Sequence, residues 1–273
     1  MAYLFIYITM KLGNTNEKDN TENKESSCDT FNAKRQNVLR SFALICSRKN
    51  KSKHDVESKM KHENDAVEIN EANILQAARD INMKKAELAL IFPNTINDFV
   101  GYIFEDWLND AHEVIIENSK TKADDAKFMN MRFSHQVKTL GVAQFHVAAL
   151  NENLLSSVAA FVKSPANILH SKSALYNNAS EAINLTKDQS TDMSFYTKRM
   201  VLGAIYAKTL LFWLNSKDIN ATCEEFCNNV DSLKNISKAK SAIKSVISAP
   251  CSVVKSASQY LGSFFKKDEE CEK

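Results

Sequence analysis

The sequence predicts an all-α protein, and three observations carry this prediction. The 273 residues include only 5 glycines and 3 prolines, whereas the hairpins and tight turns of β proteins depend on these two residues. Apolar residues recur at three- and four-residue spacing in successive segments, which is typical of amphipathic helices. Hydrophobic residues make up 44% and charged residues 25%, as in ordinary globular domains. We therefore expect a helical bundle with a sizeable core.

The first 33 residues are expected to form a disordered tail. Residues 2–10 are apolar, but they are too few to span a bilayer, which takes about 18 residues. No basic region precedes them and no arginine occurs before Arg35, so we expect neither a secretory signal nor a mitochondrial transit peptide. Met10 is an alternative start. Residues 13–30 are rich in Asn, Lys, Glu, Thr and Ser, which bury too little apolar surface to offset the entropy of ordering.

A helical domain is assigned to residues 34–240. Its first helix is predicted at residues 34–48, which carry apolar residues at helical spacing. A polar tract at residues 49–65 has the composition of the N-terminal tail, and we treat it as an insertion in this domain.

Two short helices follow the insertion and outline a helix-turn-helix unit. The first covers residues 69–81, with Asn70 as the N-cap candidate. The chain then turns at Asn82, and residues 83–92 form the second helix, which Pro93 stops. Base readout would need polar side chains on the second helix, but apolar residues dominate it. The net charge of +2 adds no argument for nucleic acid. We therefore favour a packing role for this unit.

Longer helices are predicted to build the body of the domain. Apolar residues recur at helical spacing in four segments, which are residues 95–116, 124–150, 152–163 and 166–185. A fifth helix at residues 190–214 is apolar nearly all round, and Ser190, Thr191 and Asp192 are candidates to cap it. Lys208 interrupts its apolar run, so it cannot cross a membrane. It belongs at the centre of the bundle, where it either packs in the core or walls an apolar pocket.

Catalytic and metal-binding candidates are few. Cys223 and Cys227 share a helix face, and His135 and His146 lie three helical turns apart, but neither pair has the further donors that a metal site needs. The sequence contains no glycine-rich phosphate loop, no Glu-x-x-His pair and no nucleophile–base arrangement. We therefore predict a protein that is not an enzyme, with no catalytic residue, no metal and no enzymatic cofactor. The six scattered cysteines are expected to remain reduced.

One segment is similar to a known family. The stretch STDMSFYTKR (190–199), followed by an apolar run that ends TLLFWLN (209–215), resembles the signature of the ubiquinone-biosynthesis accessory proteins often called the ninth Coq protein family. The residues SPANI (164–168) resemble the Pro-x-Asn opening of this region in the family, and Asp188 matches its acidic residue. Residues 221–240 lie where the family has its last core helix, and weaker similarity reaches back to about Lys34.

Two positions depart from the pattern of the family. Phe195 and Tyr196 stand where the family usually has Trp-Tyr, and Glu68 and Ile69 stand where it has Gly-Trp before the second helix.

The resemblance implies a fold like that of the TetR-type transcription regulators, which have a helix-turn-helix-like N-terminal part and a larger helical body. It implies that DNA reading is lost and that the body binds an isoprenoid quinone precursor or another lipid. It also implies presentation of that precursor to the di-iron demethoxyubiquinone hydroxylase. A homodimer is expected, and no nucleic acid. We assign lipid binding to six residues, which are Leu202, Ile205, Tyr206, Leu210, Phe212 and Trp213.

The polar and aromatic start of the same helix is assigned to partner binding. Aromatic side chains and arginine are enriched at binding hot spots, and consecutive positions of one helix cannot all be buried. The alternative is that Tyr196 packs inward and the cations are solvated. The residues assigned to docking the hydroxylase are Asp192, Phe195, Tyr196, Lys198 and Arg199.

Residues 241–267 are predicted to form an amphipathic helix, before an acidic tail at residues 268–273. Its apolar residues fall within about 140° of arc at 100° per residue, and from Ser232 to Lys267 the chain has lysines but no acidic residue. A basic face opposite an aromatic-rich apolar face suits a helix that lies on an anionic membrane. The competing interpretation is a helix docked on its own domain or on a dimer partner. The residues assigned to the membrane are Val253, Val254, Lys255, Ala257, Tyr260, Leu261, Phe264, Phe265 and Lys266.

Three functional classes therefore remain. We favour the lipid-binding accessory protein. A TetR-like DNA-binding regulator would instead bind a duplex sequence-specifically, with an affinity that falls steeply with salt, and an enzyme would copurify with a cofactor or metal. The bias toward Asn, Lys and Ile suggests an AT-rich genome. Because we expect no transit peptide either, we expect a cytoplasmic location, peripheral on the inner membrane of an alphaproteobacterium. The alternative is the matrix side of the mitochondrial inner membrane.

Overall fold

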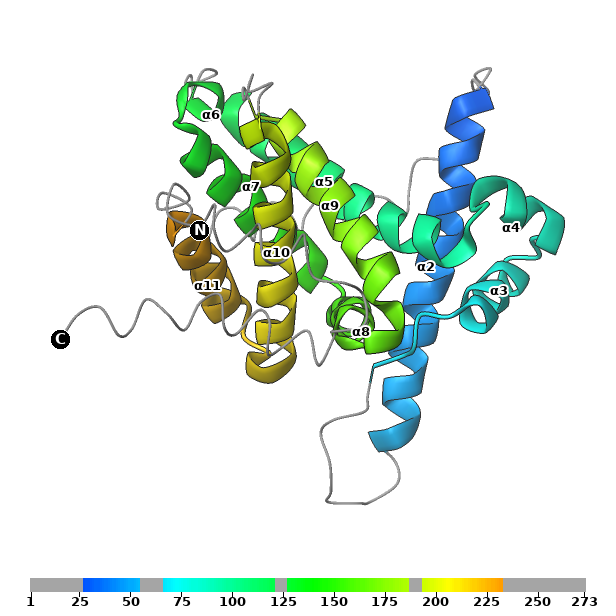
Figure 1. Cartoon of the computed structure of the whole chain (residues 1–273). Helices are drawn as coiled ribbons and strands as arrows, with labels where there is room; N and C mark the ends of the chain where they lie inside the picture. The colour runs from blue at the N-terminus through cyan, green and yellow to red at the C-terminus, as the bar shows by residue number, and fades with distance from the viewer. Residues whose placement is uncertain (1–26, 55–65, 121–126, 187–192, 233–273) are drawn as a thin grey trace.

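A computed structural model describes residues 27–54, 66–120, 127–186 and 193–232 of the chain (Figure 1). Within these ranges the protein is helical and has no strand, which confirms the predicted all-α class; the TetR-like arrangement stays a prediction. In chain order the elements are α2 (Ser27–His54), α3 (Glu71–Asp80), α4 (Lys85–Ile91), α5 (Thr95–Lys120), α6 (Lys127–Asn130), α7 (Phe133–Ala149), α8 (Glu152–Lys163), the 3-10 turn η1 (Pro165–Asn167), α9 (Ile168–Asn184), α10 (Met193–Ser216) and α11 (Ile219–Ser232).

Helix α2 is longer than the apolar stripe that predicted it. The expected helix covered residues 34–48, whereas α2 runs from Ser27 to His54. Among the side chains that the structure describes in α2, the buried apolar ones all lie within the expected segment, and they are Val38, Leu39, Phe42 and Cys46. Once these residues anchor the helix, each added residue gains a backbone hydrogen bond without a new nucleation cost, so polar residues extend it at both ends. The end of the predicted tail and the start of the predicted insertion therefore belong to α2.

The two short helices after the insertion form as predicted. Asn70 caps α3, because its side-chain oxygen accepts a hydrogen bond from the Asn73 N–H at 2.9 Å. The turn occurs at Asn82, whose φ of 59° lies in the left-handed region that asparagine tolerates. Helix α4 then buries Leu88 and Ile91 in the core. These two side chains support the packing role that the sequence predicted for this helix.

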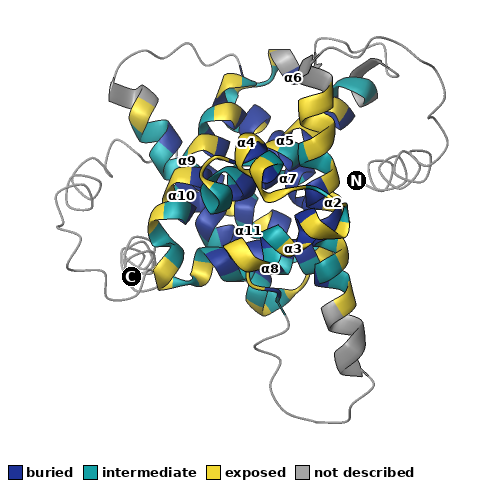
Figure 2. Cartoon of the chain, turned by 90° about the vertical axis from the view of Figure 1, so that its right-hand side faces the viewer, coloured by how far each residue is buried: buried dark blue, intermediate teal, exposed yellow. Residues whose placement is uncertain are grey.

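The body of the protein is a bundle around α5 and α10. Helix α5 packs against α7 and α9, α10 packs against α8, α9 and α11, and α11 also packs against α7. Figure 1 shows α9 and α10 running beside each other through the bundle, and Figure 2 shows buried residues on the inward faces and exposed residues outside. Buried apolar side chains of α2 to α5 and of the body form one continuous cluster. The described helices therefore share a single core.

The helix predicted at residues 124–150 is interrupted in the structure. Helix α6 ends at Asn130 and α7 begins at Phe133. The Phe128 carbonyl accepts one hydrogen bond from the Met131 N–H at 3.1 Å and another from Gln136 Nε2 at 2.9 Å. A backbone turn and a side chain of α7 thus satisfy the end of α6, and the periodicity of apolar residues gives no sign of the break.

Candidate functional site

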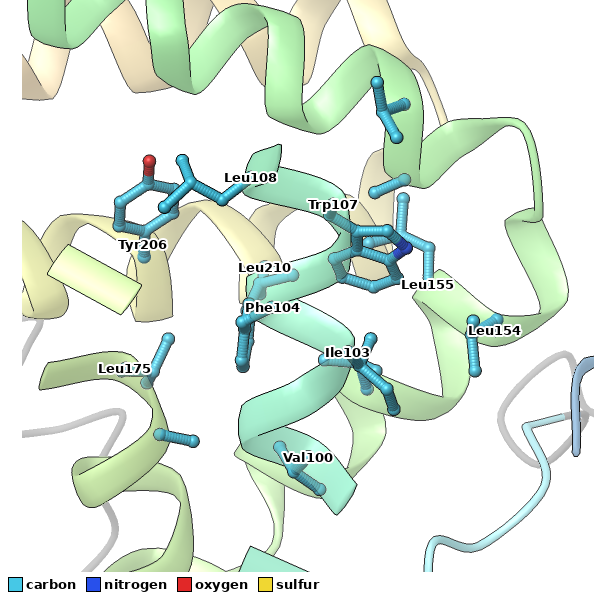
Figure 3. Close-up of a cluster of buried hydrophobic side chains, with 14 of the residues drawn as sticks. Val100, Ile103, Phe104, Trp107, Leu108, Leu154, Leu155, Leu175, Tyr206 and Leu210 are labelled. Atoms are coloured by element: carbon cyan, nitrogen blue, oxygen red, sulfur yellow. The ribbon is translucent and has the colours of Figure 1, made fainter. Parts of the chain in front are cut away.

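Helix α10 places the predicted lipid-binding residues in the interior of the bundle. Five of them are buried and the sixth, Phe212, is half-buried. Figure 3 shows Tyr206 and Leu210 of α10 among side chains of α5, α8 and α9, with Phe104, Leu155 and Leu175 as examples. The expected helix at residues 190–214 is therefore the central element that its apolar composition predicted. Its cap candidates Ser190, Thr191 and Asp192 lie outside the described residues.

An aromatic cluster closes the core between α7, α10 and α11. The ring centroid of Tyr206 lies 5.2 Å from that of Phe226 and 5.9 Å from that of Phe145, and the last two rings are 5.5 Å apart with an edge contact. Gly141 of α7 makes room for this cluster, since a Cβ there would lie 2.1 Å from Phe226 Cε1. At this end of α10 the apolar side chains contact one another, so a ligand would have to displace them.

Three buried polar side chains meet in the same core. Gln144 of α7 donates from Nε2 to the Phe104 carbonyl at 3.2 Å and to Asn178 Oδ1 of α9 at 2.8 Å. Gln144 Oε1 is buried and has no hydrogen-bond partner. Burial raises the pKa of the Tyr206 phenol, and a hydrogen bond from the Asn178 side chain acts against that rise. We call Gln144, Asn178 and Tyr206 the core polar triad.

Two members of the core polar triad, Gln144 and Asn178, are not among the residues predicted from the sequence. Gln144 lies between Ala143 and Phe145, and Asn178 is followed by Ala179; these three neighbours are all buried. A polar residue within the buried part of an otherwise apolar helix was the available signal, because buried polar groups need a partner. The sequence could not indicate that the two residues, 34 positions apart, would face each other.

Lys208, a cation in the largely apolar helix α10, is paired with side chains of α11. Lys208 Nζ lies 2.9 Å from Glu225 Oε1 and donates to Asn229 Oδ1 at 2.8 Å. Burial alone would raise the pKa of Glu225, but Lys208 and Asn229 outweigh it, and the pKa is lowered. Lys208 therefore ties the central helix to α11 and keeps its charge paired.

The residues assigned to partner binding do not form one exposed cluster. The Tyr196 side chain is 60% exposed, and Lys198 Nζ lies 5.0 Å from the ring centroid of Phe133 on α7. Arg199 is only 3% exposed; its Nε donates to Ser180 Oγ at 2.9 Å and its Nη2 to Asn184 Oδ1 at 3.0 Å. Arg199 thus binds α10 to α9, because its planar donors suit two oxygens on successive turns of α9. This position corrects the expectation of two surface cations beside Tyr196.

Several predicted site residues are beyond what the structure describes. Asp192 lies outside the described residues, and Phe195 belongs to α10 without a described side chain. The predicted amphipathic helix at 241–267 and all residues assigned to the membrane lie outside as well. None of the described helices is long and apolar enough to cross a membrane.

The two cysteines of α11 are free thiols, of which Cys223 is buried and Cys227 is half-buried. Burial raises the pKa of Cys223 to about 12, and burial also raises the pKa of Cys227. Both thiols therefore stay protonated near neutral pH, whereas metal binding and nucleophilic attack need the thiolate. Within the described ranges no group of three His, Cys, Asp or Glu side chains could hold a metal ion.

A groove of about 450 Å³ lies between α2 and the α3–α4 turn. Its walls carry basic, acidic and apolar side chains together. Lys34 pairs with Glu87 at 3.5 Å and Arg48 with Asp80 at 4.0 Å. Lys34 and Arg48 thus face acidic partners, and Arg40 is the one further cation of the lining, so the groove offers little net positive charge for a phosphate backbone. We do not assign it as a nucleic-acid site.

Asp106 of α5 is a carboxyl group whose pKa is shifted toward neutrality. Burial raises the pKa of Asp106 to about 7, and the nearby charge of Asp110 adds to the rise, while Gln36 and Arg40 of α2 oppose it. Gln36 also accepts a hydrogen bond from the Tyr102 hydroxyl at 2.9 Å. These contacts join α2 to α5, so we interpret Asp106 as part of a helix–helix contact.

Comparison with known proteins gives one family. Residues 168–237 match the family model of COQ9. The match includes α9, α10 and α11, and it confirms the resemblance seen in the sequence. The match covers 70 of the 273 residues, so it is a likeness of this part of the chain. Neither the curated proteins nor the solved structures gave a match to the chain.

Proposed function

We propose that this chain, whose residues 168–237 match the COQ9 family model, is a lipid-binding accessory protein of ubiquinone biosynthesis. It binds an isoprenoid quinone precursor inside the bundle and presents it to the demethoxyubiquinone hydroxylase. The observation that carries the proposal is the position of the family match, which falls on the helix that contributes Tyr206, Leu210 and Trp213 to the core. The family match and the apolar interior of the bundle therefore both involve helix α10.

The physical argument concerns the isoprenoid tail. Apolar surface gains about 25 cal/mol per Å² when it leaves water, so a polyprenyl chain is stabilised wherever α10 can offer it apolar walls. The walls would be the side chains of α5, α9 and α10 drawn in Figure 3, including Leu108, Leu175 and Leu210. Because these side chains contact one another in the ligand-free chain, binding requires them to repack around the tail.

Native mass spectrometry of the chain purified under mild conditions tests this proposal. We expect a copurified lipid, and we expect added isoprenoid to exchange with it. Protein that repeatedly carries no lipid and does not bind isoprenoid would contradict a lipid-binding function. DNA binding finds no specific support, since α4 buries Leu88 and Ile91 in the core.

Docking of the hydroxylase is proposed to use Tyr196. Its exposed ring stands at the start of α10, where the family tag lies. We expect Tyr196→Ala to weaken association with the hydroxylase about tenfold or more, as interface aromatics often do, because the ring offers a rigid contact surface. Binding measured by calorimetry or biolayer interferometry checks this.

The matched control for Tyr196 is Leu169→Ala, which removes another exposed apolar side chain at the start of α9. Neither substitution should shift the melting temperature by more than a degree or two, since neither side chain is buried. Unchanged affinity of Tyr196→Ala together with a large loss of stability would mean that Tyr196 serves the fold.

Membrane association is proposed for residues 241–267. The full chain should cosediment with liposomes that contain anionic lipid, and a chain that ends at Lys240 should not, because the truncation removes both the apolar face and the lysines opposite it. The substitution Phe264→Asp in the full chain should lower binding in the same direction. Equal sedimentation of the full and shortened chains would assign this segment to another role.

A further inference from the structure

The groove between α2 and the α3–α4 turn has the size of a docking site. Its volume of about 450 Å³ is enough for a few large side chains. Helix α2 forms one wall and packs beside α3 and α4 (Figure 1). Five lining residues of α2 recur at spacings of three and four, so they share one helix face, and they are Lys34, Asn37, Ser41, Leu44 and Arg48.

Apolar side chains in this groove remain accessible to solvent among the described helices. Leu44 of α2 is 56% exposed, and the half-buried Ile81 and Met83 line the groove from the α3–α4 turn. A single exposed apolar side chain is ordinary on a protein surface. Three that line one concave site are stabilised together when an apolar partner removes them from water.

The charges that line the groove face opposite charges on the protein itself. Lys34 lies 3.5 Å from Glu87, and Arg48 lies 4.0 Å from Asp80. The third cation, Arg40, opposes the raised pKa of a carboxyl group on α5. A charged group that entered the groove would find these partners engaged, and burial of a charge without a partner is unfavourable. The groove therefore favours a neutral, apolar occupant.

Residues 2–10 of the same chain have this composition. Their sequence, AYLFIYITM, contains no charged residue and is rich in aromatic and branched apolar side chains. They are too few to span a bilayer, which takes about 18 residues. Burial against a protein surface is a way to remove their apolar side chains from water.

The same residues are tethered next to the groove. Helix α2 begins at Ser27, and the polar residues 11–26 join it to the apolar segment. When extended, this tether spans roughly 50 Å, whereas Arg48 at the far end of the groove lies roughly 30 Å along α2 from Ser27. The tether therefore reaches every part of the groove. A short tether also raises the effective concentration of a segment to the millimolar range.

We propose that residues 2–10 dock in the groove between α2 and the α3–α4 turn of the same chain. The docked segment covers Leu44, Ile81 and Met83 and holds α2 against the two short helices. This inference goes beyond the proposed lipid-binding function, because it gives the helix-turn-helix-like part of the protein a ligand within its own chain.

The other long terminal segment suits the groove less well. Residues 241–267 carry lysines and no acidic residue. In the groove they would bring positive charge toward Lys34, Arg40 and Arg48, and like charges at an interface are unfavourable. The neutral N-terminal segment avoids this repulsion.

Hydrogen–deuterium exchange followed by mass spectrometry tests the docking. The full chain is compared with a chain that starts at Met10. Exchange at residues 80–84 should be about tenfold faster in the shortened chain, the ratio for a site of about 0.1 mM Kd at a millimolar effective concentration. Leu44→Asp in the full chain should give a similar increase, because a carboxylate replaces the apolar contact. Exchange in α9 to α11 should not change.

Matched substitutions separate docking from a general effect of charge. Ile6→Asp alters only the segment and should reproduce the effect of the truncation. Asn16→Asp adds the same charge to the tether and should leave exchange at residues 80–84 unchanged. Leu169→Asp, at a 72% exposed leucine of α9, should also leave it unchanged. Circular dichroism verifies that each variant keeps its helical content.

The proposal is overturned if the full and shortened chains exchange equally at residues 80–84. Protection that survives removal of residues 1–9 but is lost in a chain that ends at Lys240 would assign the groove to the C-terminal segment and overturn it. Protection that depends on protein concentration would assign the groove to a second copy of the chain, with the same consequence. The lipid content measured by native mass spectrometry tests the proposed function independently of these results.

Discussion

A chain with glutamate in place of Leu210 is expected to lose its cooperative melting transition or its solubility. Leu210 is 1% exposed and lies among apolar side chains of the core (Figure 3). A carboxylate there has no partner, because the nearby cation Lys208 already pairs with Glu225. An uncompensated buried charge costs several kcal/mol, which is comparable to the whole free energy of unfolding of about 5–15 kcal/mol.

Two variants act as controls for Leu210→Glu. Leu211→Glu places the same charge one residue along α10, on a half-buried position, and it should cost much less. Leu210→Met nearly conserves volume and should cost less than about 1.5 kcal/mol. Circular dichroism with thermal melting compares the three, and native mass spectrometry compares their lipid content. Similar melting temperatures for Leu210→Glu and Leu211→Glu would show that α10 is not the centre of the core.

Adding one methyl group at Gly141 is expected to destabilise the protein by about 1–3 kcal/mol, the usual cost of overpacking. The new Cβ would lie 2.1 Å from Cε1 and 2.2 Å from Cζ of Phe226. That ring is fully buried and touches the rings of Phe145 and Tyr206, so it cannot move without disturbing them. The clash outweighs the gain of about 1 kcal/mol that alanine brings to a helix interior.

The matched control for this prediction is Gly101→Ala in α5. No atom lies within 4 Å of a Cβ built at Gly101, so only the helical gain operates and the variant should be slightly stabilised. Chemical denaturation of both variants gives the free energies to compare. A stability of Gly141→Ala that equals that of Gly101→Ala would mean that α7 and α11 are not packed as closely as the Gly141–Phe226 contact requires.

The differences between the predicted and the observed helix boundaries have a common cause. Apolar periodicity locates the face of a helix that enters the core, and it predicted α3, α4 and α8 closely. It does not report where a helix ends once polar residues can continue it, so α2 is longer than expected. It also does not report the break between α6 and α7, where Met131 and Gln136 both donate to the Phe128 carbonyl.

The all-α class, the central position of α10 and the family resemblance could all be predicted from the sequence. Each of these depends on residues that are near one another along the chain, through helical spacing or through a contiguous motif such as residues 190–199. The tertiary structure alone decided that Arg199 is buried against α9, although its neighbours in the motif suggested a surface cation. It alone placed Gln144, Asn178 and Tyr206 together in the core. The physical reason is that a hydrogen-bond partner is chosen by helix packing, which joins residues with no regular spacing in the sequence.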